Sequence, residues 1–281
     1  MRTLTQPGPI DPVRIDMVAG EAETMAFDTR PGQTLHEALT GPMIAAGFQA
    51  GTIELTGGAF NPFRYVMPGP PDNETHVAYF TAPNAPIGET LLERANATFG
   101  WADGQPFLHC HAVWIEPDGR RRGGHILPRE AVFSRPGAAR AWGFRDVRIE
   151  TGLDRETNFT LFGVRAKALS PALSIAGAVV ARVRPNIDIA RAVEAIAQQA
   201  GMRDATIRGS LGSLVGASFA DGRAVDDLAT EVLVRSGQVR DGMAELDLAV
   251  IDMDGQVHDG VLALDRNAVL ITFDVILSRN A

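Results

Sequence analysis

The sequence is very poor in cysteine. Its single cysteine, Cys110, excludes an intramolecular disulfide framework. Cys110 stands between His109 and His111, and alternate residues of a β-strand point to opposite faces of a sheet. Its thiol is therefore predicted to point away from both imidazoles. We expect Cys110 to be a small buried residue, and neither a metal ligand nor a nucleophile.

Lysine is nearly absent, Lys167 being the clearest case, and arginine carries the positive charge. The 281 residues have a net charge of −8 and a pI of about 5.3. A sequence-independent nucleic-acid binder needs a cationic face that releases counterions, so no nucleic-acid partner is expected. The chain also shows no apolar run of transmembrane length and no segment like a signal peptide. We therefore expect no membrane association and a cytoplasmic location.

Two stretches of the chain resemble each other. Residues 30–60 align without a gap with residues 184–214, which lie 154 positions later, and Arg-Pro begins both stretches. Further on, Asp118-Gly119 falls on Asp254-Gly255, only 136 positions later. The first copy is thus 18 residues longer between these landmarks, and the surplus is expected within 68–106. Such self-similarity indicates an internal repeat.

Each copy is predicted to contain one helix, over 34–46 and over 188–200. Asp188 suits an N-cap and Gly201 the position after the helix end, whereas Pro42 is expected to break the first helix. Strands joined mostly by hairpins are expected between 51 and 134 in the first copy and between 204 and 277 in the second.

This pattern predicts an α+β fold class. We expect two tandem domains, each a mainly antiparallel twisted β-sheet packed with one or two helices. Residues 1–20 are predicted to be an extended N-terminal arm, followed by domains over 21–168 and 169–281.

Three of the six histidines lie in the segment 104–125, GQPFLHCHAVWIEPDGRRRGGH. On a strand, His109 and His111 project to the same face, and the Pro-Asp-Gly turn at 117–119 sends the chain back antiparallel. A regular ladder would set His125 opposite Ala112, one register off that face. A bulge at Gly123-Gly124 would turn His125 back onto it. Three imidazoles meeting there would form an open three-ligand metal site, with zinc as the default metal.

The same segment resembles the most diagnostic part of the plant and prokaryote conserved (PPC) domain. The matching residues are GQPFLHCH at 104–111, Asp118-Gly119, and Gly123-Gly124-His125. The resemblance covers most of the first copy and is weaker in the second. It implies a twisted, mainly antiparallel sheet packed with helices, trimeric assembly, and a metal site formed by the three histidines. The plant relatives carry AT-hook motifs that bind AT-rich DNA, and this chain has no Arg-Gly-Arg-Pro hook.

The second copy departs from this pattern. The offset of 136 places Glu245, Asp247 and Val261 at the positions of His109, His111 and His125. Valine cannot bind a metal ion, so the second copy is interpreted as a degenerate PPC-like domain without the triad. It would complete the core and the oligomer, or wall the site of the first copy.

Four further residues are assigned to the site as hypotheses. Glu93 precedes the histidine strand and is our candidate for a general base, and His76 could be an acid, a base or a fourth ligand. Arg121 and Arg122 could bind an anionic substrate, because guanidinium matches carboxylate and phosphate. Each also has a simpler interpretation, as an exposed strand or turn residue.

Three functions follow from these observations. The first is a metal-dependent enzyme acting on a small anionic metabolite by hydrolysis, hydration or isomerisation, a hydrolase, lyase or isomerase. The alternative is a non-catalytic trimeric module that binds a ligand or a protein. The third is DNA binding by family analogy, against which the net charge and the missing hook argue. A homo-oligomer is expected, with a trimer favoured.

Overall fold

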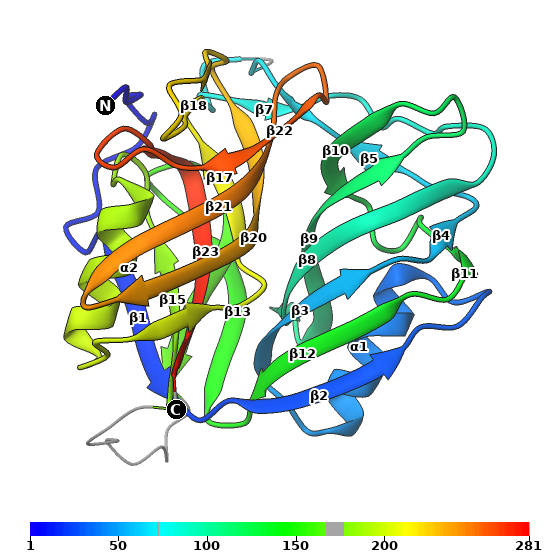
Figure 1. Ribbon diagram of the computed structural model, residues 1–281, viewed down its shortest axis with the longest axis horizontal. Coiled ribbons are helices and arrows are strands. Elements are labelled where there is room, and N and C mark those ends of the chain that lie inside the picture. The colour runs from blue at the N-terminus through cyan, green and yellow to red at the C-terminus, as the bar shows by residue number, and fades with distance from the viewer. Residues whose placement is uncertain (72, 167–176, 281) are drawn as a thin grey trace.

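The computed structural model describes residues 1–71, 73–166 and 177–280. These residues form two large β-sheets with one helix each, and Figure 1 shows the sheets side by side. Every ladder between main strands is antiparallel except a single parallel bridge. The expected class of mostly antiparallel sheets with helices is therefore confirmed. The boundary expected at 168/169 lies outside the described residues. None of the described helices has the length and apolarity needed to cross a membrane.

The first sheet contains the histidine segment. Its strands in spatial order are β2 (Glu23–Asp28), β12 (Ala138–Phe144), β3 (Ala50–Thr56), β8 (Thr90–Ala102), β9 (Gln105–Ile115), β10 (Arg121–Ile126) and β5 (Tyr65–Val66). Further strands attached to this sheet are β4 (Ala59–Phe60), β11 (Phe133–Arg135) and the hairpin of β13 (Val147–Leu153) and β14 (Thr160–Ala166).

The second sheet comes mostly from the C-terminal half of the chain. In spatial order it contains β1 (Ile15–Gly20), β15 (Ala178–Val183), β23 (Val269–Arg279), β16 (Ala205–Ile207), β20 (Thr230–Arg240), β21 (Met243–Ile251) and β22 (Val257–Val261). The strand β17 (Leu211–Leu214) joins β20 and β23. Two small sheets complete the fold, β6 (Pro68–Gly69) with β7 (Tyr79–Phe80), and β18 (Ala217–Ser218) with β19 (Ala224–Val225).

The N-terminal segment belongs to the second sheet. Residues 15–20, expected to be part of an extended arm, form the edge strand β1 against β15. Ahead of β1, the side chain of Gln6 is buried and its Nε2 donates to the carbonyl oxygen of Leu270 at 2.7 Å. The start of the chain therefore crosses from the first sheet to the far half of the molecule and stabilises it.

The two helices occupy matching places, 154 residues apart. α1 (Leu35–Ala45) precedes β3, and α2 (Ile189–Gln199) precedes β16. Asp188 caps α2 as predicted, accepting from the backbone N–H of Arg191, and Gly201 follows the helix end at φ +62°. The expected break at Pro42 was wrong, because α1 continues to Ala45. Pro42 lies in the last turn, where its missing N–H removes only one helical hydrogen bond.

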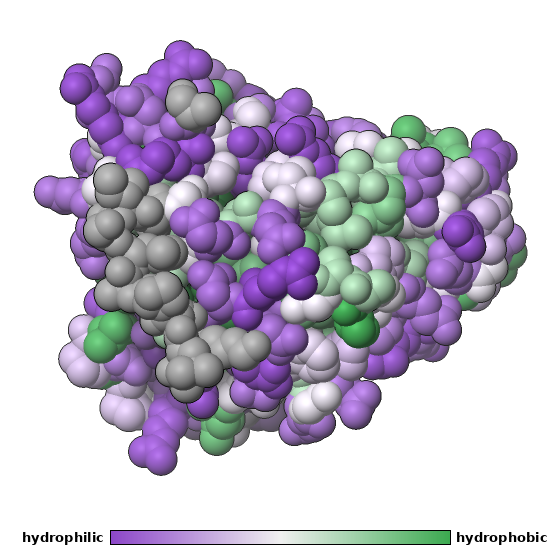
Figure 2. Space-filling view, turned by 90° about the horizontal axis from the view of Figure 1, so that it is seen from below, coloured by the Kyte–Doolittle hydropathy of each residue, from purple (hydrophilic) through white to green (hydrophobic). Residues whose placement is uncertain are grey.

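The sheets meet through a small apolar contact and one buried amide. Val113 of the first sheet packs with Leu211, Leu233 and Ala249 of the second. Beside them Asn96 is fully buried, and its Nδ2 donates to the carbonyl oxygens of Ser210 and Val234 at 2.9 and 2.8 Å. Seen from below, hydrophilic side chains cover most of the surface around a smaller hydrophobic region (Figure 2). The interface thus contains the β8–β9 surface, on which the histidines also lie.

Candidate metal centre

The β9–β10 hairpin places all three histidines on one face of the first sheet. The connecting loop 116–120 closes with Glu116 N–H donating to the carbonyl oxygen of Arg120 at 2.9 Å. A five-residue loop sets His125 directly opposite His111, and the ladder runs without a shift from Arg121 to His125. The predicted turn is confirmed, whereas the predicted bulge at Gly123-Gly124 was wrong. The longer loop already supplies the register that the bulge was expected to correct.

Gly124 is needed for another reason, and this gives a testable prediction. A Cβ at this position would lie 2.7 Å from the carbonyl oxygen of Val66, on a backbone with φ +153°. We expect Gly124→Ala to destabilise the protein by about 1–3 kcal/mol and to displace His125, as measured by urea unfolding. Gly163→Ala is the control, because its Cβ would meet its nearest atom at an ordinary 3.7 Å. Equal stability of the two variants would contradict this account.

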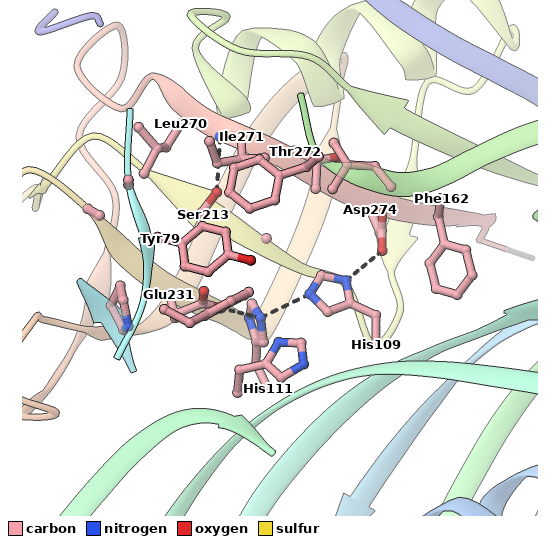
Figure 3. A pocket seen from close by; sticks show the side chains of 18 of the residues that line it. Tyr79, His109, His111, Phe162, Ser213, Glu231, Leu270, Ile271, Thr272 and Asp274 are labelled. Carbon is pink, nitrogen blue, oxygen red and sulfur yellow. Dashed lines mark hydrogen bonds and ion pairs between the residues drawn. The ribbon is translucent and has the colours of Figure 1, made fainter. Parts of the chain in front are cut away.

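The three imidazoles meet at the interface between the sheets (Figure 3). One ring nitrogen from each lies within 4.8 Å of the others, and the Nε2 atoms of His109 and His111 are 3.0 Å apart. That separation suits two ligands of one ion when each metal–nitrogen bond is about 2.0–2.1 Å. The triad predicted from the sequence is therefore assembled in space.

The second sheet orients two of these rings. Nδ1 of His109 lies 3.2 Å from a carboxylate oxygen of Asp274 on β23. Nδ1 of His111 lies 2.9 Å from the carbonyl oxygen of Val232 on β20. A carbonyl and a carboxylate accept hydrogen bonds, so both Nδ1 atoms carry the proton and both Nε2 atoms present lone pairs in the neutral rings. Metal-binding histidines characteristically have such outer partners.

Burial sets the protonation of the other rings. Burial and the neighbouring histidines lower the pKa of His125 well below 6.5, which keeps this imidazole neutral at physiological pH. Its Nδ1 is buried and has no hydrogen-bond partner among the described residues. Burial also acts to lower the pKa of His111, but Glu231 and the Val232 carbonyl outweigh it and the pKa is raised. The orphaned nitrogen of His125 is the kind of buried donor atom that a metal ion would satisfy.

A cavity of about 260 Å³ opens beside the triad. Its wall is mostly aromatic and aliphatic, with rings contributed by Tyr79, Phe80, Phe107, Phe159 and Phe162. Two of these, Tyr79 and Phe80, come from the surplus segment within 68–106, and the Phe80 ring lies 5.2 Å from that of His125. The segment that lengthens the first copy therefore reaches the site.

The polar part of the wall comes from the second sheet. Ser213, Thr230 and Thr272 line the cavity together with Glu231 and Asp274 (Figure 3). No arginine of the described residues lines it. The wall is thus apolar with a negative edge, which any bound cation would balance.

The other residues assigned from the sequence lie elsewhere. Glu93 sits at the bulge of β8 and pairs with Arg121 at 2.7 Å, and Arg121 also pairs with Asp259 at 3.0 Å. Nη1 of Arg122 donates to the carbonyl oxygen of Asp254 at 2.5 Å. The structure brings these three to the junction of the hairpin tips of the two sheets and not to the cavity.

His76 lies at the margin of the cavity. Its ring contacts those of Tyr79 and Phe159 at 5.1 and 4.4 Å between centroids, and both of these line the wall. His76 itself is not among the lining residues. Cys110 is fully buried on the opposite face, as predicted, and burial raises the pKa of its thiol to about 12.

Sequence reasoning missed Glu231 and Asp274. Both are buried in strands that are otherwise apolar, TEVLV and ITFDVIL. A buried carboxylate costs free energy unless it is paired, and that cost was the available signal. Pairing across sheets is not visible in a strand pattern, so the signal pointed to no partner.

The second hairpin has the register carried over from the first. Asp247 pairs with Val261 on β21 and β22, just as His111 pairs with His125. Asp247 lies 3.5 Å from Arg235, and Glu245 accepts a hydrogen bond from Gln238 at 3.1 Å. These acids have partners of their own, and Val261 leaves this face without a third ligand.

Comparison with known proteins gives structural neighbours only. No family model matches the chain, and no curated protein matches it. The solved structures similar to this chain include a PPC protein. That protein, from Pyrococcus horikoshii, is 17% identical with a TM-score of 0.41, over 52% of this chain and 96% of its own.

Two other neighbours have similar scores. A metal-containing protein from Archaeoglobus fulgidus is 16% identical, with a TM-score of 0.42 over 52% of this chain and 97% of its own. A candidate DNA-binding protein from Bacteroides thetaiotaomicron is 13% identical, with a TM-score of 0.39 over 52% of this chain and 98% of its own. About half of this chain is thus matched by nearly the whole of each.

Proposed function

We propose that the chain is built from two PPC-like units, of which only the first has the histidine triad. The strand order β12-β3-β8-β9-β10 of the first sheet recurs as β23-β16-β20-β21-β22 in the second. The helices preceding β3 and β16 start 154 residues apart, the offset found in the sequence. The second unit then walls the site of the first.

We further propose that His109, His111 and His125 bind a divalent metal ion, zinc by default. The observation that carries this proposal is the meeting of two imidazole lone pairs, on Nε2 of His109 and of His111, at 3.0 Å. Two lone pairs repel unless a cation lies between them. A proton can join these two atoms only, whereas a metal ion can also bind the buried, orphaned nitrogen of His125.

The activity we propose is metal-dependent hydrolysis, hydration or isomerisation of a small anionic molecule. The bound ion would supply a water of lowered pKa or a Lewis acid for a carbonyl oxygen. The aromatic wall would hold the apolar body of the substrate, and Ser213 and Thr272 could donate hydrogen bonds to it. Because Glu231 and Asp274 repel anions, the anionic group of the substrate is expected at the metal end of the cavity.

The test compares zinc-loaded protein with protein stripped by a chelator and then dialysed. Both are incubated with aryl esters, unsaturated carboxylates and keto acids, and products are followed by NMR. We expect turnover of at least one class by the loaded protein and at least a 100-fold lower rate after stripping, restored by zinc. A rate that is unchanged by stripping would contradict metal-dependent catalysis.

A binding module is the alternative, and the closed apolar wall beside the triad favours it as a ligand site. A rise in melting temperature with ligand but without turnover would support this function, because a ligand that binds only the folded state stabilises it. The trimer of chains remains a proposal that light scattering can measure.

A further inference from the structure

Glu231 is the buried acid whose position the triad alone does not explain. Its side chain is 8% exposed, and it reaches across from β20 of the second sheet (Figure 3). One carboxylate oxygen, Oε2, contacts Nε2 of His111. Among the described residues, this nitrogen is the one partner that its carboxylate has. The contact falls on the nitrogen that faces His109 and not on the outer nitrogen.

The hydrogen-bond pattern of His111 defines what this contact means. Nδ1 of His111 donates to the Val232 carbonyl, which leaves Nε2 with a lone pair in the neutral ring. Nε2 therefore faces two further electron-pair donors, Nε2 of His109 and Oε2 of Glu231. Three acceptors converge on one point with no hydrogen among them. Such a set attracts a cation, and a carboxylate oxygen is an ordinary zinc ligand beside imidazoles.

The fold itself does not require an acid here. Glu231 pairs with Ile251 as Leu91 pairs with Ile115 in the first sheet, so leucine occupies the matching position. Likewise the second sheet carries Asp247 and Val261 where the first has His111 and His125. The imidazoles come only from one sheet and the acid only from the other.

We propose that Glu231 is the fourth protein ligand of the metal ion, so that the ion bridges the two sheets. This rests on the metal binding proposed above. It makes the ion a clamp between the halves of the chain, since three ligands come from β9 and β10 and one from β20. With four protein ligands, substrate binding requires expansion to a fifth position or displacement of the carboxylate.

The experiment uses the full chain loaded with cobalt(II), whose visible spectrum reports ligand number and geometry. Glu231→Gln keeps the size of the side chain and weakens the ligand. We expect its spectrum to change and its zinc affinity to fall by more than about 100-fold, beyond the range typical of outer partners. The matched control is Asp274→Asn, whose carboxylate contacts the outer nitrogen of His109. It should keep the cobalt spectrum while losing about 10–100-fold in affinity.

X-ray absorption on the zinc-loaded wild-type protein provides a test that needs no variant. We expect a fit to three imidazole nitrogens and one carboxylate oxygen. A shell without carboxylate, or a Glu231→Gln variant with the wild-type cobalt spectrum, would overturn the bridging ligand and leave the triad intact. Wild-type protein that binds no metal would instead overturn the proposed function itself.

Discussion

Replacing His111 with alanine is expected to remove zinc from the purified protein. His111 is 1% exposed and contacts His109, the Val232 carbonyl and Glu231 at the centre of the site. Losing it removes one ligand and leaves the others too far apart to hold an ion alone. We expect zinc content to fall from one ion per chain to background, and affinity to fall more than 100-fold, beyond the effect of an outer partner. Elemental analysis and competition with a coloured chelator measure both.

His258→Ala is the control for this experiment. His258 lies on β22 of the second sheet, and its Nε2 pairs with Asp252 at 2.8 Å. It should keep a full complement of zinc. Circular dichroism must show that both variants are folded, since His111 is buried. A folded His111→Ala variant with wild-type zinc affinity would eliminate the histidine centre.

Replacing Asp154 with asparagine is expected to destabilise the fold more than any surface substitution. Asp154 is 6% exposed in the turn of the β13–β14 hairpin. Its Oδ2 contacts Arg182 at 2.8 Å and Arg184 at 2.5 Å, both on or next to β15. Removing one partner of a buried ion pair typically costs about 3–5 kcal/mol, because the remaining charges lose their compensation. Urea unfolding should show this loss, since the hairpin carrying Phe159 and Phe162 would lose its anchor to the second sheet.

The pH dependence of this difference follows from the Asp154 pKa. Burial acts to raise this pKa, but Arg182 and Thr157 lower it from 3.8 to about 2. A lowered carboxyl pKa stabilises the fold above the unfolded value, and the stabilisation is lost as pH falls through the folded value. The gap between wild type and Asp154→Asn should therefore be full above pH 5 and shrink between pH 4 and about 2.

Asp265→Asn serves as the matched control. Asp265 pairs with Arg191 at 2.7 Å, but its side chain is 62% exposed, so the loss should be within about 1 kcal/mol. A similar loss in both variants would show that burial of the Asp154 pair is not what stabilises the junction.

The site divides scaffold from chemistry within one chain. The second sheet keeps the hairpin and its Asp-Gly turn, yet contributes orienting groups in place of imidazoles. Asp274 and Val232 fix the ring orientations of His109 and His111, and Asn96 joins the sheets beside them. A substitution at the sheet interface can therefore alter the metal site without touching a histidine.

Prediction succeeded where the signal was local. The α2 boundaries follow from a capping aspartate, an apolar stripe at helical spacing and a glycine after the end, all within about 15 residues. Prediction failed beyond residue 134 of the first copy, where no strand was expected and β12, β13 and β14 are found. Sequence RPGAARAWGFRDVRIETGL mixes arginine with small residues, and its strands are stabilised by pairing with distant partners such as β2 and β3. Non-local pairing of this kind overrides local propensity.

The sequence by itself determined the triad, because residues two apart on a strand share a face and a turn returns the chain beside them. It also separated the copy with histidines from the copy without. Only the tertiary structure decided that the site lies between two sheets, with Glu231 and Asp274 on its far side. Those contacts join residues more than 100 positions apart through the packing of two surfaces. Packing of that kind leaves no periodicity in the sequence, so it emerges only when both sheets are in place.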